Sequence, residues 1–426
     1  MKNFSPMLDG NAWFLPSLST QFVKSLNDEI SDQRDRHHLK LNSIDELNFL
    51  NEEAIFHYPV ALYSPGHTDL DITKSRKLER IIFEKDKKCI IIADSGGYQV
   101  ITGKLKGLFD NNGNFNDDLR LKLLRWMEAA SDVMMTLDIP LFSLLEENLA
   151  EYKKRNKYDA PYKNFDDCLK LTIDSLEFYE QHKSGEVPFI NIIHGEDVQQ
   201  AQKWYEEVKF FEADGWAFGG ALGGDLYLTL NQLIYMRDQG ALNEAKWLHF
   251  LGFGTGYAAI MFNSLQKNLK KISPQIQVTY DASNPFQTAS FRNISVLVKR
   301  SNRKSPYVCH NDQFNSTSID QPSQSYPFST SPVLQEIPWG DIVVNPECKN
   351  FGKGSYNMDG LSYVILHANN VYQSIDVIEK SLVAFDSGEV SDQIILDCAI
   401  IDEIFESKTP YITIEKYQGK LRGLHG

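Results

Sequence analysis

Three aspartates, Asp94, Asp138 and Asp281, each follow or end a short apolar run, and carboxylates in such positions can do chemistry. His194 and Gly195 follow another run, and glycine-rich residues follow two more, at 219–224 and 252–256. Carboxylates in different surroundings can divide the roles of nucleophile, general acid/base and hydrogen-bond acceptor. Glycines let a flat ligand or a phosphate approach the backbone closely. These residue types therefore indicate an enzyme site built from carboxylates.

The apolar runs that precede these residues have the pattern of parallel strands. Continuous apolar runs are typical of strands buried on both faces, and we predict them at 12–17, 58–63, 89–93, 132–137, 187–193, 214–220, 247–253 and 277–280. Helical patterns lie between them, for instance at 119–130, 165–182, 197–210 and 227–238. Eight strand–helix alternations predict an α/β fold, a (β/α)8 TIM barrel, whose catalytic groups lie at the carboxyl ends of the strands. A doubly wound open sheet is the structural alternative.

We expect three regions along the chain. The barrel takes residues 1–300, and the Ser-, Asn-, Gln- and Pro-rich residues 301–340 are predicted to be an irregular insertion or mobile loop. Residues 341–426 form a C-terminal, α-rich subdomain, with a helical pattern at 359–385 and a short β-like run, PYITI, at 410–414.

The composition indicates a large buried core in a chain of 426 residues, 42% of them hydrophobic and 12% aromatic. No apolar run reaches the roughly 18 residues that a membrane span needs, and the first residues lack the apolar stretch of a signal peptide. Scattered cysteines predict reduced thiols and a cytoplasmic location; they are Cys89, Cys168, Cys309, Cys348 and Cys398.

The net charge of −14 disfavours nucleic-acid binding, but the charge is unevenly distributed. Between residues 261 and 304 the only acidic residue is Asp281. The basic residues of that stretch are Lys267, Lys270, Lys271, Arg292, Lys299, Arg300, Arg303 and Lys304. Such a stretch could hold a phosphate backbone. A solvated basic surface is the alternative.

Each candidate also has a purely structural interpretation. Asp94 and Asp281 could cap helices, and Asp138 before Ile-Pro could belong to a turn. His194 could be a core histidine with its hydrogen bonds satisfied, and residues 219–224 could form a tight strand–helix junction. The convergence of these residues on one barrel mouth favours the functional interpretation over each structural one.

With these residues in view, the chain resembles the tRNA-guanine transglycosylase superfamily. The most specific match is DSGGYQ at 94–99, after an apolar strand, where the family has D-S-G-G-[FY]-Q. Weaker matches follow in the family's order and together reach from about residue 56 to 290; they are SDVMMTLD at 131–138, GWAFGGALGGD at 215–225, FLGFGTG at 250–256 and VTYDASNP at 278–285.

The resemblance implies base exchange without a nucleotide cofactor. Asp281 would attack the anomeric carbon of a guanosine to form a covalent intermediate, and Asp94 would be the general acid/base. Asp138 would accept hydrogen bonds from the purine, and Tyr98 would stack on it. The other expected base-binding residues are Gln99, His194, Gly219, Gly220, Ala221 and Asp225.

The chain departs from the family's pattern in three places. His194-Gly195 replaces the family's Gln-Gly, so base preference or pH dependence is expected to differ. The nucleophile is followed by Pro285-Phe286-Gln287 where the family has P-T-R-x-x-R, so the RNA-engaging arginines are absent. The family's zinc cysteines are missing as well. Zinc is not expected, and its weak candidate ligands are Cys348, His367 and Cys309.

The loss of the RNA-engaging arginines and of the zinc module favours the branch of the superfamily that inserts 7-deazaguanines, such as 7-cyano-7-deazaguanine (preQ0), into DNA in bacterial modification systems and phages. The expected partners are therefore DNA and a 7-deazaguanine base, with no membrane. The alternatives are an enzyme acting on tRNA, a non-catalytic nucleic-acid-binding subunit and an unrelated barrel hydrolase. Two carboxylates also serve glycosidases. A homodimer or a complex with partner modification proteins is left open.

Overall fold

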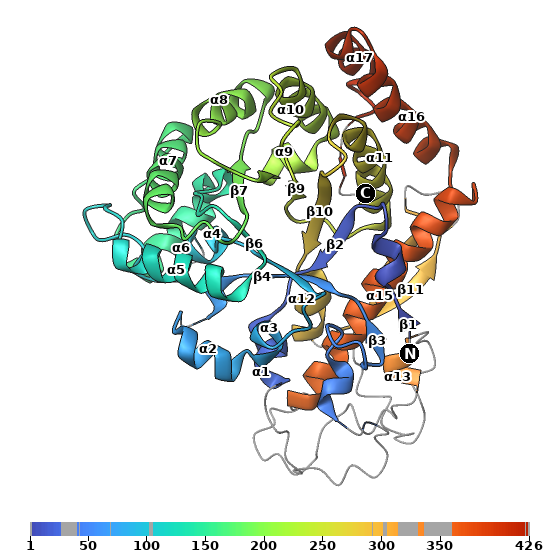
Figure 1. The fold of residues 1–426 in the computed structure, drawn as a ribbon, viewed down its shortest axis with the longest axis horizontal. Helices are drawn as coiled ribbons and strands as arrows, with labels where there is room; N and C mark the ends of the chain where they lie inside the picture. Colours follow the sequence, from blue (N-terminus) through green and yellow to red (C-terminus); the bar gives the residue numbers. More distant parts are fainter. Residues whose placement is uncertain are drawn as a thin grey trace.

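The computed structural model describes residues 2–26, 41, 43–68, 70–101, 105–291, 293–300, 305–313, 331–335, 360–421 and 423–424. Its centre is a parallel eight-stranded sheet curled into a nearly closed barrel (Figure 1). In sheet order the strands are β2 (Trp13–Pro16), β10 (Gln277–Ala282), β9 (Trp247–Phe250), β8 (Gly215–Phe218), β7 (Phe189–Ile193), β6 (Val133–Met135), β5 (Ile90–Ala93) and β4 (Val60–Tyr63).

The first and last strands of this order meet through a short bridge. Ser17 pairs with Leu62, and the Leu18 N–H donates a hydrogen bond of 2.8 Å to the Leu62 carbonyl. The arrangement is that of a (β/α)8 barrel, so the barrel part of the predicted fold is confirmed, and the open doubly wound sheet is not found. All eight predicted strands are present, because each apolar run is buried on both faces; every residue of β7 is buried, for example.

Helices surround the strands as an outer ring (Figure 1). The predicted helical patterns match α5 (Asp117–Ala130), α7 (Phe165–His182), α8 (Val198–Val208) and α10 (Leu226–Asp238). Each begins at an Asn or Asp whose side chain accepts a backbone N–H of the first turn, as helix starts prefer. The ring and the barrel mouth also contain α1 (Thr20–Ser25), α2 (Ile72–Leu78), α3 (Arg80–Phe83), α4 (Gly97–Ile101), α6 (Glu146–Asn156), α9 (Gly220–Gly224), α11 (Gly256–Ile272) and α12 (Asn284–Ser290).

Shorter elements complete the N-terminal half. Strand β1 (Lys2–Asn3) pairs in parallel with β3 (Phe56–His57) outside the barrel. Four 3-10 helices are described, η1 (Ser5–Leu8), η2 (Ile44–Leu47), η3 (Pro65–His67) and η4 (Leu141–Leu144).

A long helix, α15 (Gly360–Asp386), confirms the helical pattern predicted at 359–385 and packs against α1, α11 and α12. It also supports an antiparallel hairpin of β11 (Asn293–Lys299) and β12 (Tyr307–Gln313), since Asn370 Oδ1 accepts the Ser295 N–H at 2.8 Å. The irregular insertion predicted at 301–340 is therefore wrong at β12 and at the short helix α13 (Pro332–Gln335). The pairing that forms β12 is with residues outside the stretch, which its composition does not show.

The predicted β-like run PYITI is a further error. These residues begin helix α17 (Pro410–Tyr417), which packs on α16 (Asp392–Glu406). Pro410 occupies the first helical position, where proline is favoured because its missing N–H would have no partner there. Lys416 and Tyr417 then bind Glu403 of α16 at 3.0 and 2.8 Å, so tertiary packing overrides the β-propensity of two isoleucines.

Two expectations concern the chain as a whole. Among the described residues, no helix has both the length and the apolar character needed to cross a membrane. Cys89, Cys168, Cys309 and Cys398 are unpaired thiols, while Cys348 lies outside the described residues.

Candidate active site at the barrel mouth

A cavity of about 840 Å³ opens at the carboxyl ends of the barrel strands. Each of the eight strands contributes a residue to its lining, from the strand itself or from the loop directly after it. In chain order these are Ser17, Ser64, Asp94, Asp138, His194, Gly219, Gly252 and Asp281. The sequence therefore places its three aspartates and His194 in one cavity, at the end of the barrel where catalytic groups are found.

Asp281 is a buried carboxylate near the end of β10. The Ser17 hydroxyl donates a hydrogen bond to its Oδ2 atom, and the Gly252 N–H donates one of 3.0 Å to Oδ1. His249 Nε2 lies 3.4 Å from Oδ1, without hydrogen-bond geometry. Because both oxygens are held by different strands, the carboxylate has a fixed direction toward the cavity and does not cap α12.

Asp94 directly follows β5 and is partly exposed to the cavity. Burial, reinforced by the nearby carboxylates of Asp138 and Asp281, raises the pKa of Asp94 to about 7. Hydrogen bonds from the Ser64 hydroxyl and the Gly96 N–H act in the opposite direction. Gly96 has a φ of +85°, a left-handed conformation that favours glycine, so the Ser-Gly-Gly turn positions this carboxyl group. A carboxyl group with such a pKa can both give and take a proton near neutral pH.

Asp138 joins the ends of three strands through its two oxygens. Its Oδ1 accepts a 3.0 Å hydrogen bond from the Ser95 hydroxyl, and its Oδ2 lies 2.6 Å from His194 Nε2. Gly97 packs against it so closely that a Cβ there would lie 3.0 Å from Oδ1. Hydrogen bonds thus hold the Asp138 side chain at the cavity wall. The turn that was its structural interpretation does not account for these contacts.

His194 is buried, and its ring lies between three neighbours. It packs edge-on against Trp204 of α8, with ring centroids 5.0 Å apart, and it binds Asp138. On the third side is the backbone of Gly219 at the end of β8. The ring also lines the cavity, so His194 is placed for contact with a ligand as well as for packing.

Gly219 offers a test of this arrangement. A Cβ at this position would lie 2.4 Å from Cε1 and 2.8 Å from Nδ1 of His194, distances that real Cβ atoms do not adopt. We expect Gly219→Ala to push the ring away from Asp138, lower the free energy of unfolding by about 1–3 kcal/mol and weaken binding of a base. Urea unfolding measures the change in stability, and calorimetric titration with guanine measures the change in base affinity. Gly419→Ala is the matched control, since nothing lies within 4 Å of its Cβ. Wild-type stability and affinity in Gly219→Ala would contradict the close approach.

Aromatic side chains line the outer part of the cavity. Tyr98 is 52% exposed, and its ring lies 5.8 Å from that of Phe142. Phe291, 74% exposed, lines the cavity from the end of α12, with Phe253 and Phe286 deeper in the lining. Such a rim suits a flat, apolar-faced ligand.

The structure separates the remaining predicted base-binding residues into two groups. Gln99 and Gly220 line the cavity, and Gln99 Oε1 lies 3.2 Å from the Ser64 hydroxyl oxygen. Ala221 and Asp225 do not line it. The Asp225 side chain accepts the Tyr227 and Leu228 N–H groups at 2.8 and 3.4 Å, so it is the N-cap of α10.

The predicted basic stretch is not one surface. Three of the predicted cations, Lys267, Lys270 and Lys271, lie in the last two turns of α11, which runs away from the mouth. Two of them form ion pairs with α16. Lys271 lies 2.9 Å from Glu406, and Lys267 lies 3.9 Å from Asp402. Lys299 pairs with Glu389 at 3.2 Å. Arg300 lines a second cavity beside the mouth. The other three predicted cations, Arg292, Arg303 and Lys304, lie outside the described residues.

The weak zinc candidates do not meet in the described part of the chain. His367 packs among Phe22, Phe286 and Tyr363, and burial lowers its pKa to about 4. Cys309 lies 3.9 Å from Ser374, which is seven residues and about 10 Å of helix rise from His367. Among the residues that the structure describes, no three His, Cys, Asp or Glu side chains gather where they could hold a metal ion.

Three residues of the cavity's polar network were missed in the sequence. Ser17 and Ser64 follow β2 and β4, and the rule that located the aspartates, polar residues after a strand, would have found them. His249 lies inside β9, where its Nδ1 is 2.8 Å from the Thr279 hydroxyl; a single histidine in an apolar strand gives no such signal.

The chain matches no family model and no curated protein.

Proposed function

We propose that this protein is a base-exchange transglycosylase that replaces guanine in DNA with a 7-deazaguanine of the preQ0 type. The observation that carries the proposal is the group of three carboxylates in one cavity, each in different surroundings. Asp281 is fixed by two hydrogen bonds, Asp94 has a pKa near 7, and Asp138 is bound to His194. The resemblance of the surrounding segments to the transglycosylase superfamily supports the same assignment.

In the first half-reaction, a carboxylate oxygen of Asp281 attacks the anomeric carbon of the target nucleotide. The bond to the guanine breaks, its electron pair stays with the base, and a covalent glycosyl–enzyme ester forms. Asp94 gives its proton to the departing guanine. Ser17 and Gly252 direct the attacking group, since their hydrogen bonds fix the orientation of the Asp281 carboxylate.

In the second half-reaction, Asp94 takes the proton from the ring nitrogen of the incoming base. That nitrogen attacks the anomeric carbon, and Asp281 is released as a carboxylate. Proton transfer in both directions is most effective when the acid/base group has a pKa near the working pH, which is the case for Asp94.

Recognition of the base is assigned to the opposite wall of the cavity. Asp138 and His194 would bind the polar edge of the purine, with the backbone of Gly220 close by. Tyr98 would stack on the ring face. His194 in the place of the family's glutamine gives this chain a ring nitrogen, which can act as donor or acceptor, where an amide would stand.

DNA is favoured over tRNA by two positions on α12. Gln287 and Ser290 occupy the places of the family's two RNA-engaging arginines, and both line the cavity. The positions therefore still face the substrate but have lost the charges. A target base in a DNA duplex must leave the stack to reach Asp281, at a cost of about a few kcal/mol.

Incubation with DNA and tRNA side by side tests the proposal. With labelled guanine or labelled preQ0, we expect label in DNA and none in tRNA, counted in the purified polymer. Label in tRNA alone would identify a tRNA enzyme. Absence of exchange in both polymers, despite binding of either, would indicate a non-catalytic subunit.

A further inference from the structure

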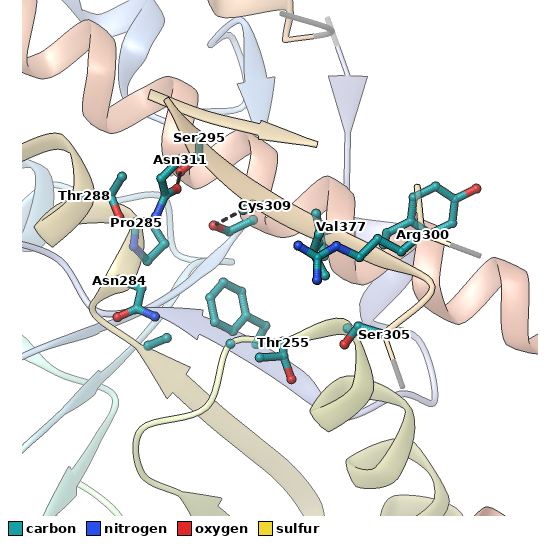
Figure 2. Close-up of a pocket in the computed structure, with 17 residues that line it drawn as sticks. Thr255, Asn284, Pro285, Thr288, Ser295, Arg300, Ser305, Cys309, Asn311 and Val377 are labelled. Atoms are coloured by element: carbon teal, nitrogen blue, oxygen red, sulfur yellow. Dashed lines mark hydrogen bonds between the residues drawn. The ribbon is translucent and has the colours of Figure 1, made fainter. Parts of the chain in front are cut away.

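A second cavity, of about 540 Å³, lies beside the candidate active site (Figure 2). Its walls come from the barrel rim on one side and from the β11–β12 hairpin and α15 on the other. Residues 254–256 at the start of α11 and Asn284, Pro285 and Thr288 of α12 form the rim side.

Helix α12 separates the two cavities. Ser283, Phe286, Gln287 and Ser290 line the active-site cavity, whereas Asn284, Pro285 and Thr288 line the second one. Strand β10 is shared in the same way, with Asp281 in the first lining and Ala282 in the second. A polymer whose sugar lies at Asp281 would therefore pass close to the second cavity.

Among the residues that the structure describes, Arg300 is the only charged one in the lining of the second cavity. In Figure 2 its guanidinium group points toward the middle of the cavity, across from Thr255. No described carboxylate pairs with it, in contrast to Lys299, which binds Glu389. Cys309 adds no negative charge, since burial raises the pKa of its thiol to about 12. The described lining of the cavity thus has an excess of one positive charge.

Neutral donors surround this charge. The Thr255 hydroxyl oxygen accepts the Ala258 N–H at 3.1 Å, and the Ser305 hydroxyl oxygen accepts the Tyr257 N–H at 3.2 Å. Because both oxygens act as acceptors for the first turn of α11, the hydroxyl hydrogens remain to be donated into the cavity. The first residue of the 17-residue helix α11, Gly256, also lines the cavity, so the positive end of the helix dipole lies at its wall.

We propose that this second cavity binds a backbone phosphate of the DNA strand whose target nucleotide lies at Asp281. Arginine, Ser, Thr and Asn side chains beside a helix N-terminus are the groups that contact nucleic-acid phosphates. A guanidinium group can bind two phosphate oxygens at once, and the hydroxyls can serve a third. Arg300 therefore binds the nucleic-acid backbone from the far side of α12. Gln287 and Ser290, which stand in the places of the family's arginines, have no charge with which to do so. This inference rests on the proposed function.

The salt dependence of DNA binding tests the site. The probe is a short fluorescein-labelled DNA duplex containing guanine, with affinity measured by fluorescence anisotropy between about 50 and 200 mM salt. Arg300→Ala should weaken binding about 10- to 100-fold, as expected for a lost charge-assisted hydrogen bond. It should also lower the slope of log K against log salt by about 0.9, the value for one phosphate contact.

Two further variants make the result specific. Asn284→Asp puts a carboxylate into the cavity with almost no change in shape, at a helix start that tolerates acidic residues, and should also weaken binding. Arg125→Ala removes a surface arginine of α5 that pairs with Glu128 at 2.6 Å, away from both cavities, and should leave the slope unchanged.

The outcomes separate this site from the proposed function. DNA binding and slope in Arg300→Ala equal to those of the wild type would overturn the phosphate site, while base exchange in the same variant would leave the proposed function standing. Arg300-dependent binding of deoxyguanosine monophosphate, with unchanged DNA binding, would assign the cavity to a free nucleotide and also overturn it. Failure of the wild type to bind or modify DNA would remove both proposals.

Discussion

Asp281→Asn is expected to abolish base exchange, with a rate at least about 10⁴-fold below that of the wild type. Loss of the nucleophile in other covalent enzymes costs up to about 10⁶-fold, and an amide is a far weaker nucleophile than a carboxylate. Initial rates of labelled guanine incorporation into DNA measure the loss. The denatured variant should also carry no DNA adduct, whereas the wild-type protein given DNA without an incoming base should carry one.

The fold should survive this replacement, because asparagine has the shape of aspartate and its oxygen can still accept the Gly252 N–H. Asp118→Asn, on the exposed first turn of α5, is the charge-matched control and should exchange bases at the wild-type rate. Turnover or an adduct at wild-type levels in Asp281→Asn would remove Asp281 as the nucleophile.

Ser17→Ala gives a graded version of the same test. The variant keeps the carboxylate but loses the hydroxyl that fixes Oδ2, so Asp281 gains rotational freedom. We expect an intermediate loss, about 10-fold from one hydrogen bond of about 1.5 kcal/mol, in the rate of adduct formation. The affinity for DNA should not change, because Ser17 acts on the orientation of Asp281. An unchanged rate of adduct formation would show that Gly252 alone suffices.

The barrel could be predicted from the sequence because its strands and its outer helices each have a characteristic local sequence pattern. Strands buried on both faces are continuous apolar runs, such as the residues of β7 and β8, and helices on the outside begin at Asn or Asp caps. The position of the carboxylates followed from the same signal, since a parallel barrel brings all carboxyl strand ends to one mouth. Asp94, Asp138 and Asp281 could therefore be grouped although they are far apart in the chain.

Pairings between distant segments leave no such signal. Lys271 looked like a free cation in the sequence, but Glu406, 135 residues later, lies 2.9 Å from it. The β12 strand was hidden for the same reason, because its partner β11 lies outside the polar stretch that contains it. Asp225 was assigned to the site by its place after a glycine-rich strand end, yet the adjacent helix start uses it as a cap. Charge and polarity in a sequence thus show what a residue can do, while its partners decide which use is made of it.

Asp94→Asn is expected to have the second large effect, a loss of about 10²- to 10⁴-fold in kcat/KM, the usual contribution of a general acid/base. Its pKa of about 7 also predicts the pH dependence. In the proposed reaction, release of guanine needs the protonated form of Asp94, so in single-turnover experiments this step should slow as the pH rises through about 7. Incorporation of the new base needs the carboxylate, so that step should slow as the pH falls through the same value. Both of these pH dependences, the two limbs of the pH profile, should be absent in Asp94→Asn.

Ser64 provides a control that keeps the acid/base group. The Ser64 hydroxyl donates a hydrogen bond that favours the carboxylate form of Asp94, so Ser64→Ala should raise the pKa further. Both pH limbs should then move to higher pH. Limbs that remain near pH 7 in Ser64→Ala would contradict this role of Ser64, and limbs that remain in Asp94→Asn would assign the titration to another group.

The same raised pKa connects Asp94 to the stability of the fold. In the unfolded chain the carboxyl group loses its proton near its ordinary value of 3.8, while in the folded protein it keeps the proton up to about pH 7. The folded state therefore binds more protons within this window, and the contribution of Asp94 to stability falls as the pH rises from 3.8 to about 7. Asparagine has no proton to lose. Urea unfolding should show Asp94→Asn gaining stability relative to wild type across this window, with a constant difference at higher pH. A difference that does not vary with pH would mean that the folded protein does not hold the Asp94 proton, and the acid/base role would then lose its physical basis.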